Sequence, residues 1–162
     1  MVVKSETLIR RAFPGEFVLM ADLAVRAWQT VARDITLTDE SRLALQTKFL
    51  RDLHENADGV LLVERSSEIL GWGAYVPNTN YISDLWVHPL HHGQGVGGVL
   101  LDALMAQIIL NGFSDAEIGT HADNFRAIGL YEKFGFHINQ RGEEWSASFG
   151  CIVEKVRMRA DL

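Results

Sequence analysis

Residues 81–105 read YISDLWVHPLHHGQGVGGVLLDALM, and they carry the strongest indication of the fold. Its first seven residues, Tyr81–Val87, predict a β-strand, and the apolar run from Val99 to Leu110 predicts a helix. Between them, residues 91–98 contain four glycines in eight positions. Glycine loses much conformational entropy on folding and packs no side chain, so either the turn or an approaching group must require it.

A strand, a glycine-rich turn and a helix form a common arrangement for binding phosphate. The first backbone N–H groups of a helix have no partner within the helix, and the helix dipole places partial positive charge there. Glycines allow phosphate oxygens to approach these N–H groups without a Cβ atom in the way. The turn therefore predicts a bound phosphate. The alternative interpretation is a tight turn whose small residues allow the helix to pack closely on the sheet.

Two well-known phosphate motifs fit this turn poorly. A Walker A loop ends in Gly-Lys-Ser/Thr, whereas this turn continues Gly97-Gly98-Val99. The G-x-G-x-x-G spacing of dinucleotide-binding folds is met at Gly93, Gly95 and Gly98. Those folds place the motif after an early strand. Here it follows four predicted strands, so a nucleotide-binding domain of that type is the weaker interpretation.

The rest of the chain predicts further strands and helices on both sides of this stretch. The expected strands are 7–13, 59–64, 69–76, 81–87, 115–120, 136–140 and 149–158, and the expected helices are 17–31, 38–53, 99–110 and 123–134. Thr38 and Asp123 are the expected N-caps of two of these helices. The order β-α-α-β-β-β-α-β-α-β-β predicts an α/β protein with a mixed sheet and helices on both faces.

Composition narrows the class of function. The 162 residues are 48% hydrophobic and 22% charged, which predicts a single globular domain over residues 1–162. A net charge of −6 argues against nucleic acid or an anionic membrane as a partner and mildly favours a cationic substrate. Neither a signal-peptide pattern nor a membrane-spanning run is recognisable, so a cytoplasmic location is expected.

Cys151 and the three histidines near the glycine turn are not expected to act as a nucleophile or as metal ligands. Cys151 is the only cysteine, and its apolar strand predicts an inert core residue. His88, His91 and His92 do not predict a metal site, because no carboxylate or cysteine completes the set at ligand spacing. Trp145, in a polar loop, is the tryptophan expected to contact a substrate.

Two segments together resemble the GCN5-related N-acetyltransferases. In residues 81–105, Gly93 and Gln94-Gly95-Val96-Gly97 match the glycine part of the family pattern Arg/Gln-x-x-Gly-x-Gly/Ala, with His92 where the family usually has Arg or Gln. Residues 124–136, NFRAIGLYEKFGF, match the pattern N-x-x-A-x-x-L-Y-E-K-x-G-F. The resemblance covers residues 59–140. It implies a splayed, mostly antiparallel mixed sheet with the cofactor in a V-shaped gap between two parallel strands.

The resemblance also implies a cosubstrate, acetyl-CoA, and its binding residues. Backbone N–H groups of the turn would hold the diphosphate, strand 85–87 would pair with the pantetheine as an added strand, and Asn124 would hydrogen-bond the pantetheine arm. The implied cofactor-binding residues are Leu85, Trp86, Val87, His92, Gly93, Gln94, Gly95, Val96, Gly97, Gly98, Asn124 and Tyr131. A plain structural role as a helix N-terminal residue remains open for Asn124.

The implied reaction is direct attack of a primary amine on the acetyl group. Tyr131 looks like the family's general acid for the leaving thiolate, although a buried core tyrosine would have the same pattern. Its spacing from Asn124 is nearly two helical turns, which places both residues on one helix face.

The amine must lose a proton before it attacks, so a base or a chain of waters is needed. Asp84 is the first candidate, and strand alternation places it on the face opposite Leu85. His121, Glu143 and Glu144 are alternative candidates, and a solvated surface charge is an equal interpretation for each of them.

The acceptor is expected to be a small-molecule amine or a protein or peptide N-terminus. Ser83 stands where polyamine acetyltransferases usually have an acidic residue, which argues against a polyamine. A homodimer is expected from the resemblance alone. The main alternative function is a non-catalytic acyl-CoA-binding module on the same fold, which would have no need for Tyr131.

Overall fold

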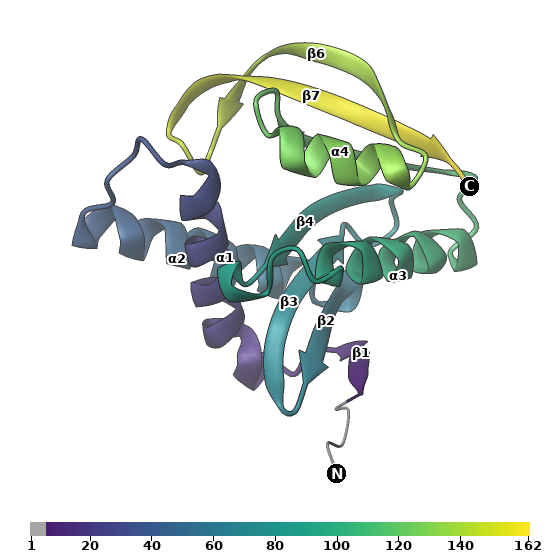
Figure 1. The fold of residues 1–162 in the computed structure, drawn as a ribbon, viewed down its shortest axis with the longest axis horizontal. Coiled ribbons are helices and arrows are strands. Elements are labelled where there is room, and N and C mark those ends of the chain that lie inside the picture. The colour runs from purple at the N-terminus through teal and green to yellow at the C-terminus, as the bar shows by residue number, and fades with distance from the viewer. Residues whose placement is uncertain (1–5) are drawn as a thin grey trace.

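The structure is a computed structural model that describes residues 6–162 (Figure 1). Its strands are β1 (Thr7–Arg11), β2 (Val60–Arg65), β3 (Glu68–Tyr75), β4 (Tyr81–Val87), β5 (Asp115–His121), β6 (His137–Ser146) and β7 (Cys151–Asp161). Its α-helices are α1 (Phe17–Val31), α2 (Asp39–Glu55), α3 (Val96–Leu110) and α4 (Phe125–Lys133), and its short 3-10 helices are η1 (Pro14–Glu16), η2 (Ala57–Gly59) and η3 (Pro89–His91). The predicted order of strands and α-helices is confirmed. Within residues 6–162, no helix combines the length and apolar character needed to cross a membrane.

The strands form one open sheet with the order β1-β2-β3-β4-β5-β7-β6. Every neighbouring pair is antiparallel except β4 and β5, which are parallel. That parallel pair is short, because only Tyr81 with Glu117 and Ile82 with Ile118 are in register. Beyond Ile82 the two strands diverge. In Figure 1 the β6–β7 hairpin arches over α4, whereas β2 and β3 lie below β4 in this view. The predicted mixed, mostly antiparallel and splayed sheet is confirmed.

A β-bulge in β4 sets the direction of the side chains at this divergence. Ala74 of β3 is opposite Asp84, whereas the next residue, Tyr75, is opposite Ile82, so Ser83 is the extra residue. After the bulge, Trp86 packs with the α1–α2 side of the core, while Leu85 packs against α3. Asp84, two residues before Trp86, therefore faces α1 and α2, as strand alternation predicted.

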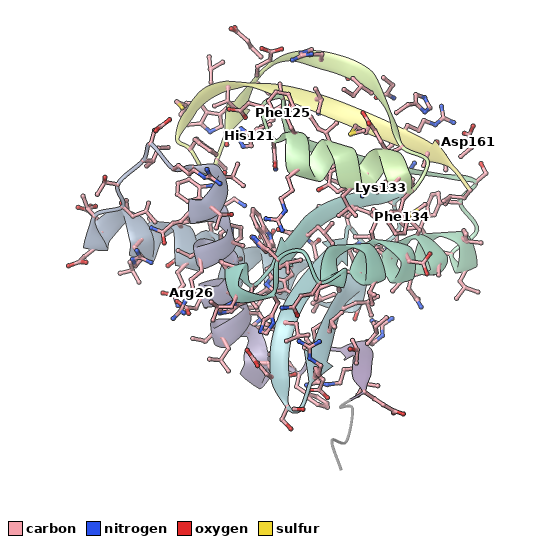
Figure 2. All side chains as sticks on the ribbon, viewed as in Figure 1. Arg26, His121, Phe125, Lys133, Phe134 and Asp161 are labelled. Atoms are coloured by element: carbon pink, nitrogen blue, oxygen red, sulfur yellow. The ribbon has the colours of Figure 1, made fainter. Side chains whose placement is uncertain are left out.

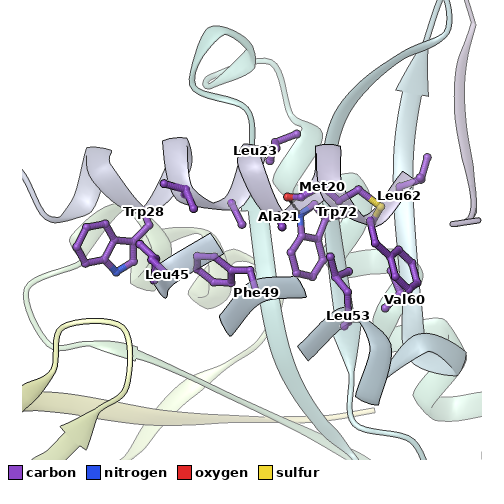
Figure 3. Packing of buried hydrophobic residues seen from close by; sticks show 14 of the residues in the cluster. Met20, Ala21, Leu23, Trp28, Leu45, Phe49, Leu53, Val60, Leu62 and Trp72 are labelled. Carbon is purple, nitrogen blue, oxygen red and sulfur yellow. Dashed lines mark hydrogen bonds between the residues drawn. The ribbon is translucent and has the colours of Figure 1, made fainter. Parts of the chain in front are cut away.

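Helices cover both faces of the sheet. One core layer joins α1 and α2 to β2 and β3 (Figure 3), where the indole N–H of Trp72 donates to the carbonyl of Met20 at 2.8 Å. Phe49 packs edge-on against Trp86 with ring centroids 5.1 Å apart. The second layer joins α3 and α4 to the central strands and to β7. Burial of each large side chain contributes about 1.5–3 kcal/mol, so these layers fix the frame that holds the diverging strands.

Several element boundaries differ from the prediction. Helix α3 begins at Val96 rather than Val99, because tertiary packing overrides the low helix propensity of two glycines. The N-cap of α4 is Asn124 rather than Asp123. Strand β6 continues to Ser146, since pairing with β7 supports polar residues of low strand propensity. Cys151 is exposed at the start of β7, so the prediction of a core residue was wrong.

Candidate active site

A cavity of about 620 Å³ lies where β4 and β5 diverge. Five elements line it: α1, β4, the glycine turn with the start of α3, β5, and α4. The structure brings to this cavity Asp84, Leu85, Trp86, Val87, His92, Gly93, Gly95, Val96, Gly97, Gly98, Asn124 and Tyr131. Gln94 is the predicted site residue that is absent from the lining. Its side chain accepts a hydrogen bond from Nη2 of Arg65 at 3.0 Å and is exposed.

The N-terminus of α3 faces the cavity without a side-chain cap. Its N-cap is Gly95, which has a φ of +82°, and no side chain of residues 6–162 caps the helix with a hydrogen bond. Gly93 has a φ of +75°, a conformation that L-residues with a side chain rarely adopt. Open space surrounds the positions where Cβ atoms would stand at both glycines. The free N–H groups of this first turn can therefore receive an anion.

The other two glycines of the turn serve a different purpose. A Cβ atom on Gly97 would come within 3.1 Å of Leu130, and one on Gly98 would come within 3.3 Å of Phe134. Both contacts are with α4 or the residue that ends it. Gly97 and Gly98 therefore allow α3 and α4 to approach each other closely. Small residues are thus needed for packing at these two positions, but the neighbour is α4 rather than the sheet, as the packing interpretation had it. The backbone conformation explains Gly93 and Gly95.

The edge of β4 that faces β5 is unpaired beyond Ile82. On its other edge, β4 pairs with β3 as far as Val87. On the β5 side, the register ends at Ile82, so those backbone groups of residues 83–87 that point away from β3 line the divergence without a strand partner. One of them, the carbonyl of Val87, lies 2.9 Å from Nε2 of His92. The remaining groups can pair with an extended, amide-containing ligand.

Tyr131 lies deep in the wall contributed by α4. The side chain is 5% exposed and packs against Phe136, with ring centroids 6.2 Å apart. Burial, with a smaller contribution from Tyr81, raises the pKa of the Tyr131 hydroxyl above its ordinary value. The phenol therefore keeps its proton at neutral pH and is available as a proton donor at the cavity surface.

Asn124 has a structural role at the start of the same helix. Its side-chain oxygen accepts from the N–H of Ala127 at 3.4 Å, and its amide nitrogen donates to the hydroxyl of Thr120 at 3.0 Å. The plain helix N-terminal role is thus present, and Asn124 also lines the cavity. Its second amide hydrogen is available for a ligand.

Asp84 lies on the wall of the cavity that faces α1 and α2. It is 7% exposed, and it accepts hydrogen bonds from the hydroxyl of Ser83 at 2.9 Å and the indole of Trp86 at 3.1 Å. Burial raises the pKa of its carboxyl, and the Trp86 hydrogen bond and the Lys48 charge oppose that shift. A carboxyl with a raised pKa beside a cavity is suited to accepting and returning a proton.

The other candidate bases lie away from the larger cavity. His121 lines an adjacent hollow of about 350 Å³ and packs against Phe149, with ring centroids 4.4 Å apart. Burial lowers the pKa of His121, so its imidazole is neutral at pH 7. Figure 2 shows His121 close to Phe125 at the start of α4. Phe125 lines both hollows.

The predicted candidates on the β6–β7 hairpin line neither hollow. Glu143 and Glu144 belong to β6, and Glu144 forms an ion pair with Arg157 at 3.3 Å. Trp145 is 65% exposed opposite Ile152 of β7. Arg126, for which the sequence gives no signal, lines the larger cavity and contacts His92. No local pattern marks a residue whose partner lies 34 positions earlier in the chain.

The sequence model of the acetyltransferase (GNAT) family matches residues 20–136 of the chain. This span begins in α1 and ends just before β6. It includes the glycine turn, the diverging strands and both helices that border the cavity, so most of the residues described above lie within the matched region.

Solved structures share the fold over nearly the whole chain. YncA from Salmonella typhimurium, solved with its cofactor acetyl-CoA, is 23% identical, with coverage of 98% of this chain and 95% of that chain and a TM-score of 0.70. The PaiA N-acetyltransferase from Thermoplasma acidophilum, in complex with coenzyme A, is 16% identical, with coverage of 97% and 99% and a TM-score of 0.75. The ribosomal-protein-S18-alanine N-acetyltransferase from Escherichia coli is 16% identical, with coverage of 96% and 94% and a TM-score of 0.73.

Proposed function

The chain belongs to the acetyltransferase (GNAT) family, and from this premise we propose that it transfers an acetyl group from acetyl-CoA to the nitrogen of a primary amine. One observation carries the proposal. The uncapped N-terminus of α3, the unpaired edge of β4 and the buried hydroxyl-bearing Tyr131 all border one cavity. These features suit, in turn, the diphosphate, the pantetheine amides and the leaving sulfur of acetyl-CoA.

The residues around the cavity fit this cosubstrate. The free N–H groups after Gly95 would hold the diphosphate, and the backbone of residues 83–87 would pair with the pantetheine amides. The free amide hydrogen of Asn124 would donate to the pantetheine arm. Bound acetyl-CoA supplies an acetyl group that is activated as a thioester. The protein therefore has to position the amine, donate a proton to the leaving thiolate and accept a proton from the amine.

Tyr131 is the proton donor for the leaving thiolate. Its raised pKa keeps the phenol protonated, and its hydroxyl donates a hydrogen bond or a proton to the sulfur as the thiol leaves. A binding-only module would have no need for a hydroxyl at this position. The alternative of a non-catalytic acyl-CoA-binding module therefore predicts that removal of this hydroxyl changes nothing.

Asp84 is the base that accepts the proton of the amine. It lies on the α1–α2 side of β4, opposite the face that packs against α3. An amine entering from the α1–α2 side would meet its carboxyl oxygens, which accept hydrogen bonds from Ser83 and Trp86. His121 is the second candidate base, because it is half-buried and neutral in the adjacent hollow.

The acceptor is a small-molecule amine or a peptide N-terminus. The adjacent hollow provides space for the part of the acceptor that carries the amine, since Val31 and Phe125 border both hollows. We further propose that residues 1–162 act as a single domain, that the protein is cytoplasmic, and that it forms a homodimer. Light scattering after size-exclusion chromatography would measure the mass of the assembly, and a monomer would contradict the dimer.

An amine panel tests the proposed function. Thiol release from acetyl-CoA would be measured with polyamines, aminoglycosides, amino acids and peptides that have free N-termini. Sustained turnover with one class would support the proposal and identify the acceptor. Binding of acetyl-CoA without turnover across the panel would favour the binding module. Absence of any stabilisation by CoA ligands would contradict both.

A further inference from the structure

Arg126 and His92 bridge two walls of the larger cavity. His92 lies in the turn between η3 and α3, and Arg126 lies in the first turn of α4. Nη1 of Arg126 is 2.6 Å from Nδ1 of His92, and both residues line the cavity. The Arg126 side chain is exposed, so this contact stands at the rim rather than in the interior.

The hydrogen bonds fix the protonation state of His92. The carbonyl of Val87 can only accept, so Nε2 of His92 carries a hydrogen and donates it across 2.9 Å. A guanidinium can only donate, so Nδ1 of His92 accepts from Arg126. The imidazole is therefore neutral and in a single tautomer. Burial, together with the charge of Arg126, lowers the pKa of His92, which agrees with this assignment.

The charge of Arg126 is not balanced by a carboxylate among residues 6–162. Of the ten other arginines in residues 6–162, five form ion pairs, for example Arg10 with Glu16 and Arg159 with Asp115, both at 2.7 Å. The partner of Arg126 is a neutral ring instead. In a chain with a net charge of −6, an unbalanced guanidinium beside the uncapped N-terminus of α3 is a local positive site.

We propose that Arg126 binds the diphosphate of the CoA nucleotide and that His92 is a positioning residue that holds its guanidinium at the cavity rim. This inference rests on the proposed function, since it assumes a CoA ligand. A guanidinium offers paired N–H donors that match phosphate oxygens. The N–H groups at the start of α3 and the guanidinium of α4 then bind one anion from two walls. Binding of the nucleotide thus holds α4 against the glycine turn.

The test compares four ligands of decreasing phosphate content by calorimetry. CoA, 3′-dephospho-CoA, pantetheine phosphate and pantetheine would be titrated into wild type, Arg126→Gln and Arg126→Lys. Arg51→Gln is the matched control, because it removes the same charge from an exposed position on α2 that does not line the cavity. We expect Arg126→Gln to weaken CoA binding about 10-fold or more. Arg126→Lys should recover part of this loss, and Arg51→Gln should stay within about 2-fold of wild type.

The phosphate series locates the contact. The proposal expects Arg126→Gln to cause equal losses with CoA and 3′-dephospho-CoA, a smaller loss with pantetheine phosphate, and none with pantetheine. A loss confined to CoA would place Arg126 on the 3′-phosphate and overturn the diphosphate assignment. Equal losses with all four ligands would show a structural effect and overturn the proposal. If wild type binds none of the ligands, the proposed function itself fails.

A double-mutant cycle tests the positioning role of His92. If His92 acts through Arg126, His92→Ala should weaken CoA binding but not pantetheine binding, and His92→Ala with Arg126→Gln should be no weaker than Arg126→Gln alone. Additive losses would overturn the positioning role. The ¹⁵N shifts of the imidazole provide a readout that does not depend on affinity. They should report the Nε2–H tautomer at pH 7 in wild type, and a protonated ring there would contradict the hydrogen-bond assignment.

Discussion

Replacement of Tyr131 by phenylalanine should separate stability from catalysis. Burial, with a smaller contribution from Tyr81, raises the pKa of the Tyr131 hydroxyl, and that hydroxyl makes no hydrogen bond to residues 6–162. Its removal therefore costs no protein hydrogen bond and relieves part of the desolvation penalty, about 1 kcal/mol at most. For a chain of this size, Tm should stay unchanged or rise by about 2–4 °C. Loss of the proton donor should lower kcat about 100-fold, which corresponds to ~2.7 kcal/mol of barrier.

The assay needs three measurements on the same preparations. Denaturation gives the change in unfolding free energy, calorimetry gives the affinity for CoA, and thiol release with the best amine of the panel gives kcat and KM. Tyr75→Phe is the matched control, because Tyr75 is equally buried at 5% exposure but does not line the cavity. An unchanged kcat in Tyr131→Phe would refute the general-acid role. Equal losses in kcat and CoA affinity, accompanied by a lower Tm, would show that the tyrosine is a packing residue.

Three further predictions concern the frame of the site. Burial raises the pKa of Asp84 above the 3.8 of an exposed aspartate, so its contribution to stability is complete below pH 3.8 and is lost as pH rises through the folded-state pKa. Asp84→Asn should therefore raise Tm more at pH 7 than at pH 4 while it lowers kcat, and an equal gain at both values would contradict the raised pKa. Gly95→Ala should destabilise by about 1–2 kcal/mol in urea unfolding because of its φ of +82°, whereas Gly129→Ala, in a helix with open space around the new Cβ, should stabilise by about 0.5–1 kcal/mol. Phe49→Ala should lower the free energy of unfolding by about 3–5 kcal/mol. It should also lower kcat, since the Phe49 ring packs against the Trp86 indole that hydrogen-bonds to Asp84. Leu43→Ala, at a position with 64% exposure, should lower the free energy of unfolding by less than about 1 kcal/mol in the same assay.

The sequence predicted the elements well because their signals are local. Apolar spacing identifies α1 and α2, and the capping residue Thr38 marks the start of α2, where its side chain accepts from the N–H of Ser41. The β4 bulge at Ser83 has no such signal. At the bulge, β4 has one more residue than the segment of β3 that pairs with it. Such a register depends on both strands, so neither strand's sequence alone reveals it.

The four glycines of the turn show the same limit in another form. The sequence indicated that the turn needed glycine but left two reasons open, a close approach to phosphate and close packing of the helix on the sheet. The structure assigns positive φ angles to Gly93 and Gly95 and a helix contact to Gly97 and Gly98. The helix contact could not be predicted, because the opposing atoms belong to residues that follow more than 30 positions later.

When several elements contribute to a binding site, the replacement of one motif residue does not by itself indicate that binding is lost. At position 92 this chain has a histidine where the family pattern usually has Arg or Gln. The histidine ring accepts a hydrogen bond from a guanidinium that enters from α4. What a bound anion requires is positive charge and N–H donors at a place in space, and any element that borders that place can supply them. A pattern read along one segment records only the donors of that segment, so the cation at this rim becomes visible only when α3 and α4 are seen together.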